Sequence, residues 1–298
     1  MRRGCSQGAK LLLFVLCAAL LLSSCGAEQS SLPLSDRISN CGEVVAGIRR
    51  ALRERDASVT LRFDYGSDIY DELNAVVDDW FEAALAETAN PAEGDYLRCQ
   101  LGGCKWESSR EYRDGRWHYA VTLRPVCYTS PEQEQAVTER VSELLSGFGF
   151  DRRTGDYEKL KAIYDALRGS VSYDRVHRKN PHSHLKSTAY GALVLHSATC
   201  QGYCAALYRL LREAGINCRV VTGAAEGEEA LHAWIIAELE GQYYNLDPTW
   251  DAGTEPSRYF LLGSAEFGDH VPGERFQSAE FTARCPMAAE RYRKEGTL

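Results

Sequence analysis

The spacing of apolar residues predicts an N-terminal segment that contains both helices and strands. Apolar residues recur at helical spacing from Ile38 to Leu52 and again from Ile69 to Leu85. Residues 58–64 instead alternate apolar and polar positions, as a half-buried strand does. Three further strands are predicted, at residues 95–100, 104–109 and 115–125.

A capped helix is predicted to close this first segment. Ser130 is a typical N-cap residue, Pro131 suits the first helical position, and Gln133 can complete a capping box. Gly-rich and charged residues from Gly147 to Asp156 then interrupt the pattern. We therefore predict a small α+β domain over residues 37–150.

Residues 151–298 are predicted to form a second domain, which also mixes helices and strands. Two helices are indicated, the first from Tyr157 to Leu167 and the second over residues 201–214, where Gly215 ends it. A polar loop over residues 177–188 separates them. Three strands follow, at residues 217–223, 231–239 and 242–247.

Composition limits the class of protein. The chain has 298 residues, of which 44% are hydrophobic and 26% charged, as in ordinary globular proteins. This excludes a disordered, collagen-like or polytopic membrane protein as an overall description. Acidic residues outnumber basic ones by 42 to 34, giving a net charge of -8, so the chain lacks the basic balance typical of nucleic-acid partners.

The first residues have the layout of an export signal. Three basic residues precede an apolar run from Leu11 to Leu22, which is too short and wrongly flanked for a lasting membrane span. The sequence Leu22-Ser23-Ser24-Cys25 resembles a bacterial lipobox, which implies that Cys25 is diacylated and becomes the new N-terminus. A plain secretory signal with an incidental cysteine is the alternative.

These features predict where the protein resides. Residues 1–24 would be a lipoprotein signal peptide, and the polar, Pro-containing residues 25–36 would form a lipidated tether. Two acyl chains on Cys25 suffice for stable membrane attachment. We therefore expect a soluble body anchored to the outer face of the bacterial cytoplasmic membrane, with the membrane as its partner through the anchor.

Cys200 is the strongest candidate for a nucleophile. It immediately precedes the predicted helix over residues 201–214, so its sulfur should lie at the helix N-terminus. Unpaired N–H groups and the helix dipole at that end favour a thiolate, which is the reactive form of cysteine. A buried cysteine that acts as a small apolar residue is the alternative.

His232 and Asp247 are expected to lie on one face of a hairpin. If Glu240-Gly241 forms a two-residue turn, residue 239 faces 242, and His232 and Asp247 become diagonal cross-strand neighbours. A one-residue slip would instead put Asp247 on the opposite face. Asp251 is a possible substitute for Asp247, but it falls beyond the strand.

Three ordered motifs resemble those of the transglutaminase-like superfamily. They are Thr199-Cys200-Gln201-Gly202-Tyr203, Leu231-His232-Ala233-Trp234 and Asn245-Leu246-Asp247-Pro248-Thr249-Trp250-Asp251, within a similarity that spans roughly residues 152–270. The resemblance implies a papain-like α+β fold, in which a helix with cysteine at its N-terminus packs on an antiparallel sheet. It also implies a triad of Cys200 as nucleophile, His232 as general acid and base, and Asp247 as the residue that orients His232.

The superfamily's shared chemistry is thiolate attack on an amide or ester carbonyl, giving an acyl-enzyme that water or an amine resolves. The backbone N–H of Cys200 would contact the oxyanion. The second donor stays open between Tyr190 and the His196-Ser197 stretch. Tyr190, Trp234 and Trp250 are the predicted substrate-binding residues, although a place in the core or the wall of the cleft is favoured for the two tryptophans over a role in stacking on substrate.

The remaining histidines and cysteines give weaker signals. Four histidines in or near the polar loop could suggest a zinc site, but their spacing fixes no common face and a solvated loop is favoured; they are His177, His182, His184 and His196. We therefore expect no metal and no organic cofactor. Cys99 and Cys104 could form a disulfide across a hairpin, whereas the pairing of Cys41, Cys127, Cys204, Cys218 and Cys285 stays open.

The sequence thus predicts a lipid-anchored, extracytoplasmic cysteine enzyme that acts on amide bonds of a peptide, protein or cell-wall substrate. Hydrolysis is slightly favoured over acyl transfer. A catalytically silent, surface-displayed binding module on the same scaffold is the alternative, and a metal-dependent protein that uses the histidine loop is a third hypothesis.

Overall fold

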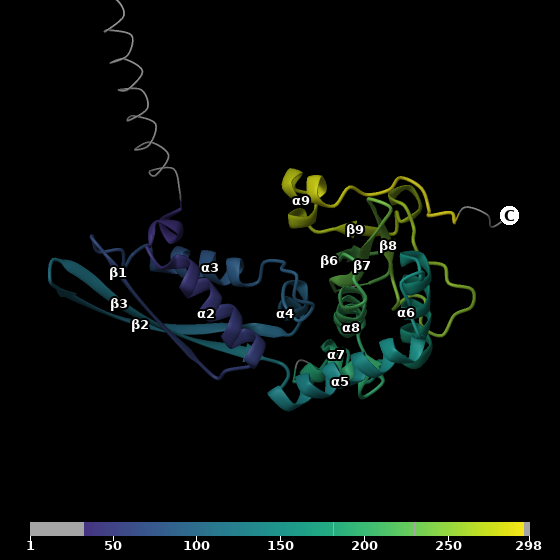
Figure 1. The fold of residues 1–298 in the computed structure, drawn as a ribbon, viewed down its shortest axis with the longest axis horizontal. Coiled ribbons are helices and arrows are strands. Elements are labelled where there is room, and N and C mark those ends of the chain that lie inside the picture. Colours follow the sequence, from purple (N-terminus) through teal and green to yellow (C-terminus); the bar gives the residue numbers. More distant parts are fainter. Residues whose placement is uncertain (1–32, 181, 229, 295–298) are drawn as a thin grey trace, which may run out of the picture.

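The computed structural model describes residues 33–180, 182–228 and 230–294. The predicted signal peptide, the tether up to residue 32 and the lipidation site Cys25 lie outside these residues. Within the described part of the chain, no helix is long and apolar enough to cross a membrane. Figure 1 shows two lobes side by side, the N-terminal one in purple and blue and the C-terminal one in teal to yellow.

The N-terminal lobe is a three-stranded antiparallel sheet covered by helices. Its strands β1 (Val59–Tyr65), β2 (Leu101–Arg113) and β3 (Arg116–Cys127) lie in the order β1-β3-β2. A core of apolar side chains joins this sheet to α2 (Cys41–Glu54) and α3 (Leu73–Ala84). The 3-10 helix η1 (Leu34–Arg37) precedes them. Three of the predicted strands and both predicted helices are confirmed.

The strand predicted at residues 95–100 is wrong, because Asp95–Cys99 forms the short helix α4. Tyr96 packs in the core of the C-terminal lobe, while the adjacent Leu97 packs in that of the N-terminal lobe. Periodicity in so short an apolar run does not distinguish helix from strand. The hairpin expected between Cys99 and Cys104 is also absent, and both of these cysteines are free thiols.

Helix α4 connects the two lobes (Figure 1). The buried Asp95 carboxylate accepts hydrogen bonds from Arg219 Nε at 2.8 Å and from the Val220 backbone N–H at 2.9 Å. The Tyr208 hydroxyl donates to Glu87 at 2.6 Å. These buried, charge-assisted bonds fix the first lobe against the second.

Helix α5 (Pro131–Phe148) begins with the predicted capping box between Ser130 and Gln133. The sequence pattern places this helix in the first predicted domain, residues 37–150. Its buried residues Val137 and Val141 instead pack in the core of the C-terminal lobe.

The C-terminal lobe is built on a four-stranded antiparallel sheet in the order β8-β7-β6-β9. The largely buried helix α8 (Cys200–Glu213) contacts β6 and β7 of this sheet, next to α6 (Asp156–Ser170) and α7 (Ala189–Leu193). A second cluster around Trp234 and Phe267 forms a separate core. The strands are β6 (Cys218–Ala225), β7 (His232–Leu239), β8 (Gln242–Leu246) and β9 (His270–Pro272).

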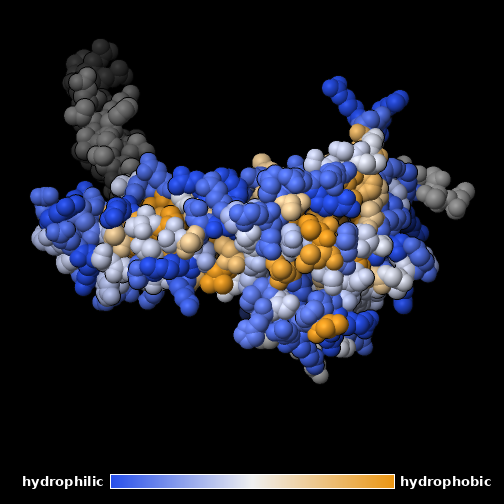
Figure 2. Space-filling view, turned by 90° about the horizontal axis from the view of Figure 1, so that it is seen from below, coloured by the Kyte–Doolittle hydropathy of each residue, from blue (hydrophilic) through white to orange (hydrophobic). Residues whose placement is uncertain are grey.

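This arrangement of a cysteine-bearing helix on an antiparallel sheet confirms the predicted α+β fold class. Short elements complete the lobe: the 3-10 helices η2 (His184–Ser187), η3 (Ser264–Glu266) and η4 (Glu274–Phe276), and α9 (Ala279–Arg284). Hydrophilic residues cover most of the face in Figure 2, and apolar ones gather near its middle.

A tight backbone contact sets the position where α8 begins. The two-residue strands β4 (Ser172–Tyr173) and β5 (Ser197–Ala198) pair in parallel, and β5 leads directly into α8. The Thr199 N–H donates to Lys186 O at 2.8 Å. A Cβ on Gly202 would lie 2.6 Å from that same oxygen, so only glycine permits this approach.

Candidate active site

Cys200 lies at the first position of α8, as predicted. Thr199 precedes it as the N-cap in an extended conformation, and the Cys200 side chain is half-buried against the core of the lobe. The N–H groups in the first turn of a helix have no intrahelical acceptor. The thiol is therefore next to several backbone donors and the positive end of the helix dipole.

The predicted register between β7 and β8 is confirmed. Leu239 pairs with Gln242 and Ile235 with Leu246. Glu240 and Gly241 form the turn, both with positive φ (55° and 80°), as a type I′ hairpin turn requires.

This register brings the two predicted partners together across the hairpin. His232 Nε2 lies 2.7 Å from Asp247 Oδ2, and both side chains are buried, with exposed fractions of 4% and 0%. Cys200 lies close enough to interact with the imidazole, and the two residues line the same part of a cleft.

The surroundings of His232 favour its protonated form. Burial by itself would lower the pKa of the imidazole, but the hydrogen bonds to Asp247 and Cys200 outweigh burial and raise the pKa to about 10. A protonated imidazole between a carboxylate and a sulfur stabilises a thiolate at Cys200.

Asp247 is held by four donors. Its Oδ1 accepts the backbone N–H groups of Thr249 at 2.8 Å and Trp250 at 3.1 Å. Its Oδ2 faces His232 and also His270 Nε2, at 3.2 Å. Burial works against the charge, but the bonds to His232 and His270 lower the pKa of Asp247, so it stays ionised.

His270 is a member of this cluster that sequence reasoning missed. It lies on β9, is 5% exposed, and its Nδ1 faces Asp269 Oδ1 at 2.7 Å. The Tyr259 hydroxyl donates to the other oxygen of Asp269, also at 2.7 Å. A single histidine in a three-residue strand gives no periodic signal, and only the pairing of β9 with β6 brings it near Asp247.

The same three residues are a possible metal-binding set. The donor atoms of His232, Asp247 and His270 lie within 4.8 Å of one another, and among the described residues no other group of three such side chains is this close. Ligand atoms around tetrahedral zinc are about 3.3 Å apart. The 2.7 Å contact is shorter than that and has the length of a direct hydrogen bond, so the geometry favours a proton-sharing network.

A cleft opens beside the triad. One part, of about 390 Å³, is lined by Cys200 and His232, and a larger part, of about 850 Å³, by His232 and Trp250. Tyr173, which sequence reasoning missed, lines both parts. Burial and then the charge of Cys200 raise the pKa of Tyr173, which reflects its closeness to the nucleophile. Its sequence signal was only a short apolar stretch before a polar loop.

Of the predicted substrate-binding residues, the structure brings only Trp250 to this cleft. Trp234 is fully buried and donates to Asn245 Oδ1 at 3.2 Å, so it is a core residue and does not face the cleft. Tyr190 packs against the core and is not among the cleft-lining residues. His196 is exposed and lines neither part of the cleft.

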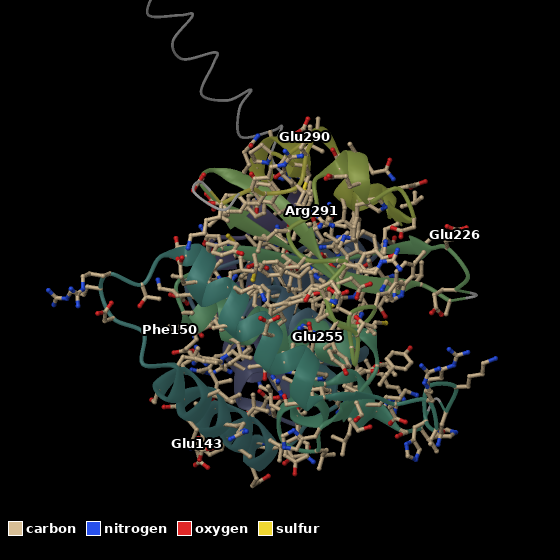
Figure 3. All side chains as sticks on the ribbon, turned by 90° about the vertical axis from the view of Figure 1, so that its right-hand side faces the viewer. Glu143, Phe150, Glu226, Glu255, Glu290 and Arg291 are labelled. Carbon is tan, nitrogen blue, oxygen red and sulfur yellow. The ribbon has the colours of Figure 1, made fainter. Side chains whose placement is uncertain are left out.

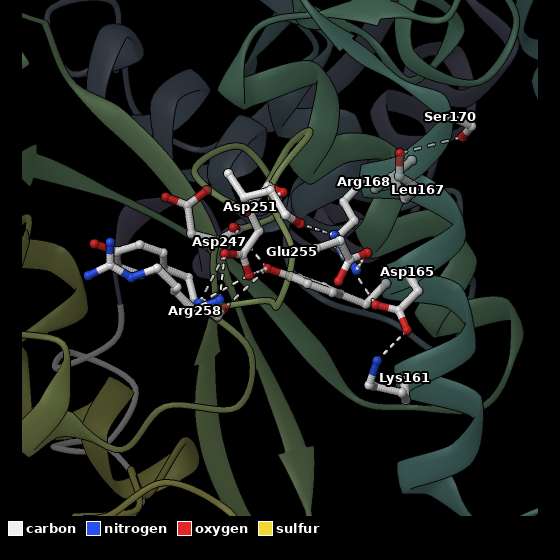
Figure 4. Close-up of polar contacts among 12 residues, drawn as sticks. Lys161, Asp165, Leu167, Arg168, Ser170, Asp247, Asp251, Glu255 and Arg258 are labelled. Atoms are coloured by element: carbon white, nitrogen blue, oxygen red, sulfur yellow. Dashed lines mark hydrogen bonds and ion pairs between the residues drawn. The ribbon is translucent and has the colours of Figure 1, made fainter.

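Asp251 does not substitute for Asp247. Its buried carboxylate accepts the Tyr164 hydroxyl at 2.6 Å and the backbone N–H groups of Arg258 and Tyr259 (Figure 4). It therefore fixes the loop that follows β8. In the histidine loop, His177 bonds to Asp174 and His184 stacks on Tyr128, so these two imidazoles face different partners.

Comparison with known sequences supports this assignment of the fold. Residues 149–248 match the model of the transglutaminase-like superfamily. The chain is 28% identical over 165 residues to the kyphoscoliosis peptidases of Mus musculus and Homo sapiens. That similarity covers 48% of this chain but only 24% of each relative, so the chain spans about a quarter of the length of these curated relatives.

Two solved structures also overlap with parts of the chain. A TGase crystal structure gives a TM-score of 0.37 at 18% identity, covering 51% of this chain and 47% of the TGase. A proposed cysteine protease from Cytophaga hutchinsonii gives a TM-score of 0.33 at 14% identity, covering 58% of this chain and 69% of that protein.

The raised pKa of His232 has a measurable consequence. Because the folded value of about 10 exceeds the ordinary 6.5, the imidazolium stabilises the fold fully below pH 6.5, and this contribution is lost as the pH rises through 10. We expect NMR titration to show His232 protonated at neutral pH, and Cys200→Ala to lower its pKa by removing one partner. A midpoint near 6.5 in the intact protein would contradict the ion pair.

Proposed function

We propose that this chain, whose residues 149–248 form a transglutaminase-like domain, is a cysteine enzyme that cleaves or exchanges amide bonds. The observation that carries the proposal is the contact series from Cys200 through His232 to the buried Asp247, open to a cleft. Nucleophile, base and orienting carboxylate in hydrogen-bonding reach are the signature of nucleophilic catalysis. The name of the curated relatives, peptidase, favours peptide bonds as substrates.

The first half of the reaction transfers the acyl group to the enzyme. The Cys200 thiolate attacks the carbonyl carbon, a C–S bond forms, and the carbonyl oxygen becomes an oxyanion. His232 then donates its proton to the leaving nitrogen, so that the C–N bond breaks and a neutral amine departs. The thioester and a neutral imidazole remain.

The second half regenerates the thiolate. The neutral His232 accepts a proton from water or from an acceptor amine, which attacks the thioester carbon. The C–S bond breaks, and the thiolate and imidazolium are restored. Asp247 keeps the imidazole oriented through both halves, because its 2.7 Å bond holds Nε2 and directs the other nitrogen to sulfur.

The oxyanion requires donors near the start of α8. Cys200 occupies the first position of α8, so its backbone N–H has no acceptor within the helix. This N–H points out of the helix N-terminus and is available to donate to the oxyanion. For the second donor, the cleft position of Tyr173 makes its hydroxyl a better candidate than the side chains of Tyr190 or His196.

The reactivity of the Cys200 thiol can be measured without knowing the substrate. At pH 6.5 an ordinary cysteine with a pKa of about 8.5 is only about 1% thiolate. We expect Cys200 to react with iodoacetamide at this pH, and His232→Ala to slow the reaction at least about tenfold, as followed by mass spectrometry of the Cys200 peptide. Cys41→Ala, which changes a half-buried thiol of the N-terminal lobe, serves as control. If Cys200 reacted at the same rate in the wild type and in His232→Ala, the alternative of a catalytically silent binding module would be favoured.

We further propose that His270 is a positioning residue. Its bond to Asp247 Oδ2 restrains the carboxylate from the side opposite to the Oδ1 donors and helps to keep the pKa of Asp247 low. Without this bond the Asp247 carboxylate could rotate or accept a proton. Either change would weaken its hydrogen bond to His232.

The His270 proposal predicts a shift in pH dependence. We expect His270→Ala to move the acidic limb of Cys200 alkylation to higher pH, because the pKa of Asp247 rises. His270→Gln, which keeps an N–H donor, should restore part of the wild-type profile. His118→Ala, which removes an imidazole bonded to Asp64 on the N-terminal sheet, is the control. If both His270 variants lowered the rate of Cys200 alkylation equally and left the acidic limb of the pH profile unshifted, His270 would contribute only through packing.

We also propose that the protein is anchored outside the cytoplasm by acyl chains on Cys25. The export signal and the lipobox-like residues before Cys25 support this. Bacteria that express the chain and are fed labelled palmitate should label the wild type, but not Cys25→Ser, and the label should partition with detergent. Cys41→Ser should keep the label. Equal labelling of the wild type and Cys25→Ser would exclude this anchor.

A further inference from the structure

The two parts of the cleft are adjacent and share part of their lining. The smaller part contains the nucleophile, the larger part extends along Trp250, and four residues line both: Tyr173, Arg178, Glu228 and His232. Arg178 and Glu228 therefore lie where a substrate that reached from Cys200 into the larger part would pass.

The charge of this cleft is opposite to that of the protein. Besides His232, its lining includes the cations Arg168, Arg175, Arg178, Lys179 and Lys186, against the anions Glu228 and Glu255. Arg168 and Glu255 form an ion pair at the far end, next to Asp165 (Figure 4). Among the described residues of the lining, Arg175, Arg178 and Lys186 still outnumber Glu228, although the chain carries a net charge of -8.

The loop that carries most of these cations is anchored at both ends. The buried Asp174 begins it, and its carboxylate accepts the His177 backbone N–H at 2.8 Å and faces the His177 ring at 3.0 Å. Lys186 ends it, donating from Nζ to His177 O at 2.6 Å and to Asn180 O. In Figure 3 this teal loop projects at the lower right with nitrogen-tipped side chains, below the loop that begins at Glu226.

Anchoring this loop also fixes it relative to the nucleophile. Lys186 O accepts the Thr199 N–H, and Gly202 packs against the same oxygen, so the loop end contacts the first turn of α8. Arg178 lines the smaller part of the cleft together with Tyr173 and Cys200. The guanidinium of Arg178 therefore belongs to the same part of the cleft as the nucleophile.

We propose that this cleft selects amide substrates that carry a carboxylate next to the scissile bond, with Arg178 and Arg175 as the recognising cations. This deepens the proposed function and rests on it. A guanidinium binds a carboxylate through two parallel hydrogen bonds, which fixes both the position and the orientation of the substrate. Glu228, on the facing loop, would repel a second carboxylate at that point.

Two alkylating reagents that differ in charge test the cleft directly. Iodoacetate is anionic and iodoacetamide neutral; the first transfers a carboxymethyl group and the second a carbamoylmethyl group to sulfur, each with loss of iodide. The rate with the neutral reagent depends on the fraction of thiolate and on the accessibility of Cys200. The ratio of the iodoacetate rate to the iodoacetamide rate therefore isolates the effect of the cleft's charge on an anionic reagent. We expect Arg178→Gln and Arg175→Gln to lower this ratio by about threefold to tenfold each.

Arg152→Gln, in the exposed loop before α6, is the matched control and should leave the ratio unchanged. The wild-type ratio should also fall as salt is added, because screening weakens the attraction. A ratio that is equal in the two cleft variants, the control and the wild type would overturn the proposal.

A binding measurement separates this proposal from the proposed enzymatic function. We would titrate the Cys200→Ala protein with two blocked tripeptides, Gln-Glu-Gln and Gln-Gln-Gln, by calorimetry. Tighter binding of the acidic peptide by about threefold or more, lost in Cys200→Ala/Arg178→Gln, supports the carboxylate subsite even if Cys200 of the intact protein reacts with neither reagent. Equal binding of the two peptides would overturn it, whatever the reactivity of the thiol.

Discussion

The buried Asp247 carboxylate is the constraint on which the rest of the site depends. A charge with no exposed surface is tolerated only when donors surround it, and here two backbone N–H groups and two imidazoles do so. The backbone donors come from the turn just after β8, while the imidazoles come from β7 and β9. One carboxylate therefore joins three parts of the sheet and sets the orientation of His232.

The nucleophile is positioned by backbone packing. Strand β5 leads into α8 against the Lys186 carbonyl, and Gly202 permits an approach that no larger residue would. The N-terminal lobe contributes to the same support, since Gln201 donates from its side chain to Cys99 O, at the end of α4. The residue that follows the nucleophile thus contacts the helix shared by the two lobes, although every proposed reacting group belongs to the C-terminal one.

Two electrostatic environments meet at Cys200. On one side the buried pair of His232 and Asp247 is shielded from solvent and keeps its charges at neutral pH. On the other side, exposed arginines and lysines give the cleft a local excess of positive charge within an acidic protein. In the function proposed here, the first environment would generate the thiolate and the second would select what reaches it, so reactivity and specificity could be altered through different residues.

The sequence by itself determined the local features: the capping box at Ser130, the helix behind Cys200, and the turn at Glu240-Gly241 that sets the register of His232 and Asp247. These follow from short-range rules of spacing, capping and turn geometry. Only the tertiary structure decided that residues 95–99 form a helix shared by two cores, that Trp234 is buried, and that His270 reaches Asp247. Those outcomes depend on contacts between residues distant in sequence, which no local pattern records.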